Sequence, residues 1–558
     1  MTARRKRLGL LAILGLALAV RLLHFAAVRT DPFVAHPILD SQEYDRWARA
    51  ILAGSAPAEA FFQPPLYPYF IAGLYALSAA TPAAVYLAQI LLALAGCWAL
   101  FRAGERLAGE RVGIAAAALF ATYPLFVLHD VQLLKESLAV TLSATMLWAL
   151  IEGCANGRPA LWAAAGLAAG TLCLLRENTL LVLPLLASLA WKPAAAARLR
   201  RIAAFLLAAS LPLLPVAWRN ARAGGGFLPT TFQGGVNFYI GNHAGADGTY
   251  QPLVPGKQIP AYERGESVRL AEQAVGRKLR PSEVSRYWLS RSLGWARAQP
   301  AAFIRLQLRK LRLFWSWYEW PDAVDPYYLC SVSPILRLPW LDFGGVTILA
   351  LAGLWMGRRR LGELAPVLIW IAGSMLATTI FFLFSRYRLP TVPALMLLAA
   401  LPLAALADAM GARDRRREIA LAALVVAALV LPRLPGYQPR WDLVHFNLGR
   451  VHQEAGDAAA AEREYRLALQ ENPRDFLSCL NLGTMAARSG DYADARQWFE
   501  KAVEIEPASD DAEANLGGAL LATGERGAAR IHLERALQLN PSNAFALHNL
   551  GILERGRE

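Results

Sequence analysis

Long apolar runs recur through the first three quarters of the chain, and they constrain its fold more than any other feature. Several approach the roughly 20 residues that a helix needs to span a lipid bilayer. Backbone polar groups find no water inside a bilayer, so such runs fold as helices. We therefore predict an all-α fold in which residues 1–435 form a polytopic membrane domain. The runs cover residues 8–28, 66–80, 83–101, 112–128, 136–153, 160–175, 179–191, 202–218, 343–357, 364–384, 389–408 and 418–432.

Positive charge is concentrated between these runs. The whole chain carries +14, but residues 441–558 hold 12 Lys and Arg against 19 Asp and Glu, so residues 1–440 carry +21. Short basic clusters between apolar runs are typical of topology signals and lipid headgroup contacts, not of a nucleic-acid-binding face. The clusters are Arg102 to Arg111, Arg158, Lys192 to Arg201, Arg358 to Arg360 and Arg413 to Arg417.

The same charges predict the topology. Arg4 to Arg7 precede the first apolar run, which favours a cytoplasmic N-terminus. A signal peptide would share this pattern, but no clear cleavage site follows, so we expect a retained first helix. If the short, proline-broken piece 66–80 does not cross the membrane, every basic cluster falls inside. The loops 29–65 and 219–342, and the chain beyond 432, then lie on the outer face of a bacterial plasma membrane.

The 219–342 loop is long enough to form a small module. Helical patterns are expected at about 262–277 and 282–298. Residues 301–320 interleave arginines with Leu, Phe and Trp, a pattern typical of a helix lying at the membrane interface.

The last part of the chain repeats every 34 residues. Leu-Gly pairs begin at Leu448, Leu482, Leu516 and Leu550, and Pro473, Pro507 and Pro541 keep the same spacing. This pattern resembles the tetratricopeptide repeat, an α-solenoid unit of two helices. We assign repeats to 442–475, 476–509, 510–543 and, in part, 544–558. The resemblance implies a surface that binds a protein partner or acceptor.

The five cysteines form no CxxC pair and predict neither a zinc site nor a disulfide framework. Ionisable residues beside the apolar runs are more informative, because such groups are costly near a membrane and need a reason. An acid beside several cations fits deprotonation of a hydroxyl together with stabilisation of an anionic leaving group. Next to a membrane, that leaving group is expected to be a lipid phosphate. The ionisable residues beside the apolar runs are Asp40, Glu43, His129, Asp130, Lys135, Glu136, Arg176, Glu177, Arg386 and Arg388.

The order of these groups resembles the GT-C class of membrane glycosyltransferases, most closely family 39, which contains protein O-mannosyltransferases and aminoarabinose transferases. The motifs that carry the resemblance are Asp40-Ser41-x-x-Tyr44, Pro64-Pro65-Leu66, Lys135-Glu136-Ser137-Leu138, Arg176-Glu177-Asn178 and Arg386-Tyr387-Arg388-Leu389-Pro390. It covers about residues 8–410.

The resemblance implies a polyprenyl-phosphate-linked sugar as donor and Asp40 as the catalytic base. Arg386 and Arg388 would hold the lipid phosphate, with Lys135, and Glu136 would contact sugar or acceptor. Ser41 replaces a second acid of the family motif, and Gln63 replaces a phosphate-binding lysine of the aminoarabinose enzymes. The full set of implied substrate-binding residues is Glu43, Tyr44, Lys135, Glu136, Arg176, Arg386, Tyr387 and Arg388.

Each assignment has a structural alternative. Asp40 could cap a helix over 42–53, the two arginines near 386 could be interfacial anchors, and Arg176-Glu177 could be a structural pair. His129 and Asp130 could be two ligands of a metal site. Two ligands are too few, however, and polar residues at the end of a helix fit better. A divalent metal thus stays an alternative, although no ligand cluster in the sequence supports it.

Three other functions fit parts of the pattern. A non-catalytic scaffold would bind proteins through the repeats. A ligase using a polyprenyl-diphosphate oligosaccharide would share the chemistry, although that class usually places its key loop late in the membrane domain. A transporter would show internally repeated halves, and none is evident in 8–432.

Overall fold

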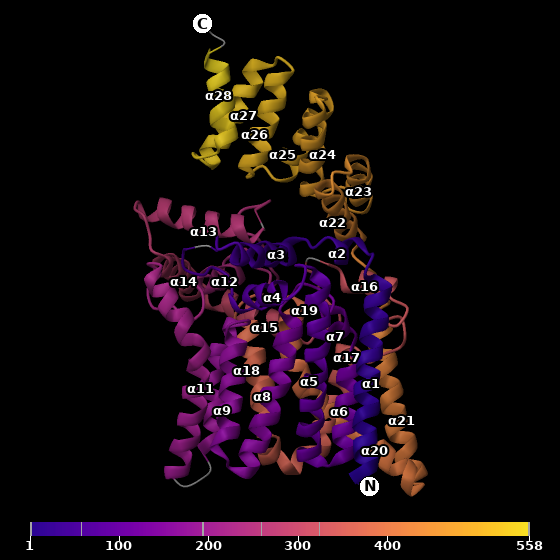
Figure 1. Ribbon diagram of the computed structural model, residues 1–558. Coiled ribbons are helices and arrows are strands. Elements are labelled where there is room, and N and C mark those ends of the chain that lie inside the picture. Colours follow the sequence, from indigo (N-terminus) through magenta and orange to yellow (C-terminus); the bar gives the residue numbers. More distant parts are fainter. Residues whose placement is uncertain (1–2, 57, 192–194, 258, 323, 556–558) are drawn as a thin grey trace. The chain divides into compact units, whose positions relative to one another are not determined.

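The computed structural model describes residues 3–56, 58–191, 195–257, 259–322 and 324–555. Within these ranges the chain is all-α and holds no strand, which confirms the predicted fold class. It forms two compact units (Figure 1). The first comprises residues 1–251, 267–322 and 329–438, and the second comprises 252–266, 323–328 and 439–558.

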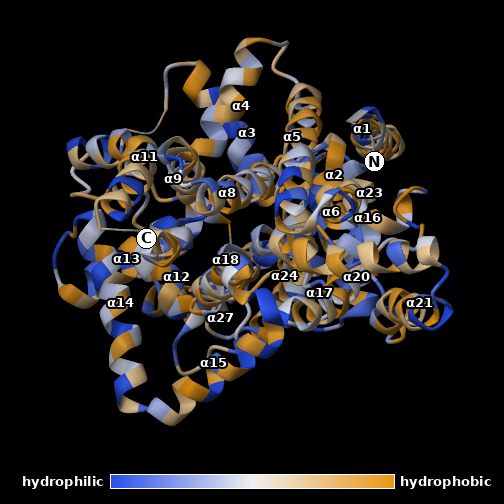
Figure 2. Cartoon of the chain, turned by 90° about the horizontal axis from the view of Figure 1, so that it is seen from below, coloured by the Kyte–Doolittle hydropathy of each residue, from blue (hydrophilic) through white to orange (hydrophobic). Residues whose placement is uncertain are grey.

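The first unit is a bundle of apolar helices. Within the described residues, six segments are long and apolar enough to cross a membrane. Two shorter apolar segments, Pro159–Cys173 and Glu177–Trp191, accompany them. Seen end-on, the bundle helices carry mainly hydrophobic residues (Figure 2). The six segments are Lys6–Val28, Pro82–Ala108, Glu136–Asn156, Ala195–Arg222, Phe343–Thr379 and Ser385–Ala412.

These segments follow the predicted runs closely. The bundle helices are α1 (Ala3–Val28), α5 (Pro82–Ala108), α6 (Glu110–Thr122), α7 (Pro124–His129), α8 (Glu136–Asn156), α9 (Pro159–Cys173), η1 (Glu177–Val182), α10 (Leu183–Ala187), η2 (Ser188–Trp191), α11 (Ala195–Arg222), α17 (Phe343–Gly357), η3 (Arg358–Arg360), α18 (Leu361–Thr379), α19 (Ser385–Arg388), η4 (Leu389–Thr391), α20 (Val392–Ala412), α21 (Arg415–Val430) and η5 (Leu431–Arg433).

The length of helix α4 (Leu66–Ala76) bears on whether the run 66–80 crosses the membrane. It has 11 residues, a length of about 16 Å at 1.5 Å per residue, whereas the hydrocarbon core is about 30 Å thick. The piece 66–80 therefore does not cross a bilayer alone, as predicted. Together with α3 (Leu39–Leu52) it lies at the end of the bundle opposite the N-terminus (Figure 1).

Small residues let some bundle helices touch backbone to backbone. A Cβ added at Gly166 would lie 2.0 Å from the Phe205 carbonyl oxygen, and one added at Gly170 would lie 2.0 Å from that of Ala209. Two glycines four residues apart thus form the contact surface of α9 with α11, a familiar arrangement in membrane helix pairs.

Ion pairs join the basic clusters at the N-terminal end of the bundle. Lys6 pairs with Glu105 and Arg111 with Asp408. Arg102 lies 3.7 Å from a carboxylate oxygen of Glu152. Segments from several helices therefore bring their charged ends together.

The segments of the first unit outside the bundle also form helices. They are α2 (Pro32–Ala35), α3, α4, α12 (Gly234–Gly241), α14 (Pro281–Ala298), α15 (Pro300–Phe314) and part of α13 (Pro260–Val275); α16 (Pro326–Val332) links the two units. The predicted interfacial helix corresponds to α15, which exposes Ile304 and Leu308 beside Arg305 and Arg309.

The second unit contains the repeats. Their helices are α22 (Trp441–Glu454), α23 (Ala458–Glu471), α24 (Phe476–Ser489), α25 (Tyr492–Ile505), α26 (Asp510–Ala522), α27 (Arg526–Leu539) and α28 (Ala544–Arg555). The Leu-Gly glycines lie where helices touch. The Tyr465 ring is 2.6 Å from the point where a Cβ would stand on Gly449, and the Phe499 ring stands equally close to that point on Gly483.

Candidate active site

Asp40 lies in the first turn of α3, and its carboxylate contacts Arg386. The N-cap residue is Ile38, which makes no side-chain cap, so the alternative that Asp40 caps this helix is wrong. Leu39 has a φ of 50°, a left-handed conformation that side chains seldom adopt. Strained residues of this kind are often found next to functional groups, and here one precedes the candidate base.

The Asp40 carboxylate is paired with Arg386. The Arg386 Nη2 atom donates to Asp40 Oδ2 at 2.6 Å, although the two residues are 346 positions apart. Arg386 is buried at 8% exposure, and it belongs to the short helix α19 that precedes η4 and α20. The segment after α1 and the last apolar segments therefore meet at one ion pair.

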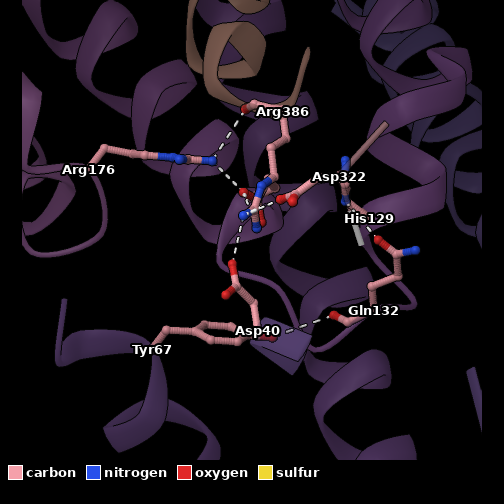
Figure 3. A network of polar contacts seen from close by, with 8 residues as sticks. Asp40, Tyr67, His129, Gln132, Arg176, Asp322 and Arg386 are labelled. Carbon is pink, nitrogen blue, oxygen red and sulfur yellow. Dashed lines mark hydrogen bonds and ion pairs between the residues drawn. The ribbon is translucent and has the colours of Figure 1, made fainter. Parts of the chain in front are cut away.

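A second ion pair adjoins the first. Glu136 opens α8 and contacts Arg176, which precedes η1. Arg176 also donates to the Arg386 backbone oxygen at 3.3 Å, and Arg386 Nη1 lies 3.8 Å from Glu136. Four predicted site residues thus form one network (Figure 3). The structural alternative for Arg176, a pair with Glu177, is not what the structure shows.

Aromatic side chains enclose the network. The Tyr387 ring lies 4.6 Å from the Arg176 guanidinium and 5.4 Å from that of Arg386. Tyr44 is also buried, edge-on against Tyr67 at 5.2 Å between ring centroids. Burial, then the Asp40 charge, raises the pKa of Tyr44 well above its usual value, so this phenol stays neutral.

Asp322 completes the cluster, and the sequence reasoning missed it. Its carboxylate contacts the same Arg386 Nη2 atom that binds Asp40 (Figure 3). Desolvation inside the cluster raises the pKa of Asp322 to about 6. No motif includes Asp322. The only sequence signal for this residue was its position directly after Pro321 and the aromatic stretch Trp315 to Trp320.

Arg388 points elsewhere. It is buried at 1% exposure and donates to the backbone oxygens of Phe314, at 2.7 Å, and Ser316, at 2.5 Å. It also pairs with Glu319 at 2.8 Å. Arg388 thus donates to the segment that precedes Asp322, whereas Arg386 contacts the carboxylates of the cluster.

A cavity of about 100 Å³ adjoins the network. Lys135 and Arg176 supply its positive charge, and Tyr387 forms one wall. Burial lowers the pKa of Lys135 to about 8, so this ammonium is still charged at neutral pH. The remaining lining residues are Pro64, Leu175, Glu177, Asn178, Gln233, Gly234, Asn237, Thr378, Phe381 and Phe382.

The other candidates lie outside the network. Glu43 faces Arg46 on the same helix at 3.7 Å. Asp130 pairs with Arg21 at 2.7 Å, and His129 lies 2.9 Å from Gln132. His129-Asp130 is thus a polar helix end, the interpretation that the sequence favoured. Within the described ranges, no group of three His, Cys, Asp or Glu is arranged to hold a metal ion.

Comparison with known families concerns the membrane bundle and the repeats. The family matches support a membrane glycosyltransferase of the GT-C class, followed by tetratricopeptide repeats. Within that class, residues 62–218 match the model of the dolichyl-phosphate-mannose-protein mannosyltransferase family. Tetratricopeptide repeat models match residues 446–514 and 486–550. The resemblance drawn from the order of the motifs is therefore confirmed.

Solved structures give weaker likenesses. The Archaeoglobus fulgidus oligosaccharyltransferase AglB, in complex with an inhibitory peptide and a dolichol-phosphate, is 13% identical with a TM-score of 0.45, covering 80% of this chain and 58% of that one. The chain thus spans less than two thirds of that enzyme. The MamA protein is 28% identical with a TM-score of 0.21, covering 21% of this chain and 64% of that one. No curated protein matches the chain.

Proposed function

We propose that this enzyme moves a sugar from a polyprenyl-phosphate donor to a hydroxyl acceptor on the outer face of the membrane. One observation carries the proposal above all. Asp40 from the first external loop lies 2.6 Å from Arg386, which follows the last long external loop. The proposed base and the proposed phosphate-binding cation are thus adjacent and largely buried, where electrostatic interactions are stronger than in water.

The proposed reaction is a direct displacement. Asp40 takes the proton of the acceptor hydroxyl, and the acceptor oxygen forms a bond to the anomeric carbon of the sugar. The bond from that carbon to the phosphate oxygen breaks, and its electron pair stays on the polyprenyl phosphate. Attack from the side opposite the leaving group inverts the anomeric configuration.

Arg386 and Lys135 are proposed to stabilise the leaving phosphate. Arg386 holds a guanidinium next to Asp40, and Lys135 supplies an ammonium to the adjoining cavity. Charge-assisted hydrogen bonds to phosphate are about twice as strong as neutral ones. Arg176 and Glu136 orient Arg386 through the second ion pair, while Tyr44 and Tyr387 shield the site from water.

Arg388 takes a different proposed role. Because its donors bind the backbone of Phe314 and Ser316 and the Glu319 carboxylate, it anchors the loop that carries Asp322 instead of holding phosphate. The repeats are proposed to recruit a protein partner, plausible acceptors being proteins or cell-envelope glycans and lipids. A scaffold would have no use for the buried acid and base cluster.

The test replaces Asp40 by Asn in the full-length enzyme. Asn keeps the size of the side chain but takes no proton, so we expect sugar transfer to fall about 100- to 10,000-fold, the usual contribution of a general base. Transfer is measured by mass spectrometry of surface glycoproteins and glycolipids from cells carrying either form. Near-normal transfer by Asp40→Asn would refute the proposed mechanism.

A matched control lies in the same helix. Asp45 pairs with Arg49 at 2.8 Å and accepts from Tyr75 at 2.6 Å, outside the Arg386 cluster. Asp45→Asn should therefore retain transfer within a few-fold. Equal losses in both variants would mean that α3 has been disturbed, and not that a base has been removed.

A further inference from the structure

The contacts of Arg386 are concentrated on one of its three guanidinium nitrogens. Its Nη2 atom contacts both the Asp40 and the Asp322 carboxylates. Its Nε and Nη1 atoms are buried and have no hydrogen-bond partner among the described residues. A phosphate is normally held by two nitrogens of a guanidinium. Two carboxylates therefore crowd one nitrogen of a group that has unused donors.

We propose that Asp322 occupies the place of the donor phosphate on Arg386 in the free enzyme, and leaves Arg386 with uptake of a proton when the donor binds. This inference rests on the proposed function, since it concerns the same phosphate. It makes Asp322 a positioning residue that keeps the cluster neutral and Arg386 oriented before the donor arrives.

The charge balance of the cluster supports this exchange. Lys135, Arg176 and Arg386 bring three positive charges, and Asp40, Glu136 and Asp322 bring three negative ones. A further acid, Glu177, lines the same cavity as Lys135 and accepts a hydrogen bond from Gln233 at 2.6 Å. A sugar polyprenyl phosphate is a phosphodiester and adds one more negative charge. A buried site tolerates uncompensated charge poorly and answers by protonating one group. One acid must therefore take a proton or move to water.

Asp322 is the acid whose place in the fold allows this. Glu136 is fixed in the first turn of α8 at 1% exposure and holds Arg176. Asp40 must stay ionised to act as the base. The Asp322 side chain is 27% exposed, and it lies in the connection between α15 and α16, outside any helix.

Before Asp322, Arg388 holds the loop as far as Glu319, and the Ser385 N–H donates to the Trp320 backbone oxygen at 3.5 Å. Arg388 binds the backbone of Phe314 and Ser316 and, at 2.8 Å, the Glu319 carboxylate. Asp322 lies two residues beyond Trp320. A short displacement of its carboxylate therefore need not disturb the anchored segment or the helices around it.

The charged neighbours of Asp322 agree with uptake of a proton. Asp40 on α3 and Glu136 on α8 raise its pKa, while Arg386 on α19 and Arg176 before η1 lower it. Desolvation is the largest effect, and the resulting pKa is about 6. A phosphate on Arg386 would add a second repulsive charge and raise this pKa further.

A pH dependence of donor binding follows from linkage. If binding takes up a proton at Asp322, affinity is highest below its free pKa and falls as pH rises, by up to about tenfold per pH unit. Two other titratable groups line the adjoining cavity, Lys135, with a pKa of about 8, and Glu177. Measurements between pH 5.5 and 7.5 keep Lys135 mostly charged, and comparison with Asp322→Asn separates Asp322 from Glu177.

The experiment measures binding of decaprenyl methyl phosphate to the full-length enzyme in nanodiscs. This diester carries one fixed negative charge and does not titrate in the range used. We expect the wild-type Kd to rise about tenfold or more between pH 5.5 and 7.5. Asp322→Asn, which mimics the protonated acid, should bind about tenfold more tightly than wild type at pH 7.5, with a flat profile.

Two further variants serve as controls. Asp322→Glu keeps the charge and should keep the slope. Asp247→Asn changes an acid of the same external loop that accepts from Thr249 at 2.7 Å, outside the cluster, and should bind like wild type. Weaker binding by Asp322→Asn, or an unchanged slope in a folded variant, would overturn the inference while leaving the proposed function intact.

The wild-type enzyme alone is sufficient to test the exchange if Asp322→Asn fails to fold. Calorimetry at pH 7 in two buffers of different ionisation enthalpy counts the protons bound with the ligand. We expect uptake of nearly one proton, and none would refute the exchange. No binding of the diester by wild-type enzyme would instead refute the proposed phosphate site itself, and this inference with it.

Discussion

Arg386 and Arg388 are two positions apart in the sequence, and they contact different parts of the segment 314–322. Arg386 binds Asp40 and Asp322, both of which carry charge. Arg388 binds backbone oxygens and Glu319, with its guanidinium 3.6 Å from the Phe343 ring centroid. Because α19 and η4 turn tightly here, neighbouring side chains point to different surroundings. One arginine is thereby assigned to chemistry and the other to the fold.

This difference predicts distinct losses. Arg388→Met would leave Glu319 and two backbone oxygens without their buried donor, a loss expected to cost about 3–5 kcal/mol of stability. Arg386→Gln removes the cation that both Asp40 and Asp322 contact. Because Asp322 can take a proton and so lose its charge, we expect folding to be largely kept, whereas donor affinity and turnover should fall.

Thermal unfolding in detergent, read beside donor binding, separates the two. We expect a clear drop in Tm for Arg388→Met and a small one for Arg386→Gln, with the reverse order for loss of donor binding. A stable Arg388→Met enzyme with weakened donor binding would return Arg388 to the phosphate site.

The residues of the cluster were predictable to different degrees. Asp40, Glu136, Arg176 and Arg386 stood out because ionisable side chains beside apolar runs need a partner. Asp322 did not, since it comes from a long loop whose path depends on tertiary contacts and not on any period in the sequence. For Arg388, the sequence analysis predicted contact with the lipid phosphate or, as the alternative, an interfacial anchor, but not the carbonyl oxygens it binds.

At the scale of elements, helix positions followed from periodicity and composition. The 34-residue period placed the repeat helices, and the run lengths placed the bundle helices. The sequence did not show which helices touch. That depends on surface shape, and the contact of α9 with α11 shows how strict the requirement is.

Gly170→Leu should break this contact. A Cβ at this position would already lie 2.0 Å from the Ala209 oxygen, so α9 and α11 must move apart. Forcing a large side chain into a packed interface typically costs about 1–3 kcal/mol. Thermal unfolding of the purified protein should show a lower Tm. Gly15→Leu on α1, where no atom lies within 4 Å of the added Cβ, is the control and should unfold like wild type.

At the scale of the whole membrane unit, the distribution of charge and the position of the site belong together. The charged ends of α5, α6, α8 and α20 meet near the N-terminus, joined by pairs such as Arg111 with Asp408. The acid cluster lies with α3 and α19 at the opposite end of the bundle (Figure 1). The positive-inside rule then predicts that the site faces the outside, where lipid-linked sugars are consumed.

Thiol labelling of intact cells tests this orientation. The five native cysteines are free, so they can be replaced to give a background without reactive thiols. Single cysteines are then introduced at Ser55 in the first external loop, at Asn156 at the end of α8, and at Ser489 in the repeats. All three positions are exposed to solvent in the structure.

We expect a membrane-impermeant maleimide to label Ser55→Cys and Ser489→Cys in intact cells and Asn156→Cys only after the membrane is opened. The reason is the odd number of crossings between the N-terminus and the first loop, and the even number between that loop and the repeats. Labelling of Asn156→Cys in intact cells would invert the topology and place the site inside. Labelling of Ser55→Cys without Ser489→Cys would instead show that one apolar run between them has been counted wrongly, and would separate the repeats from the catalytic face.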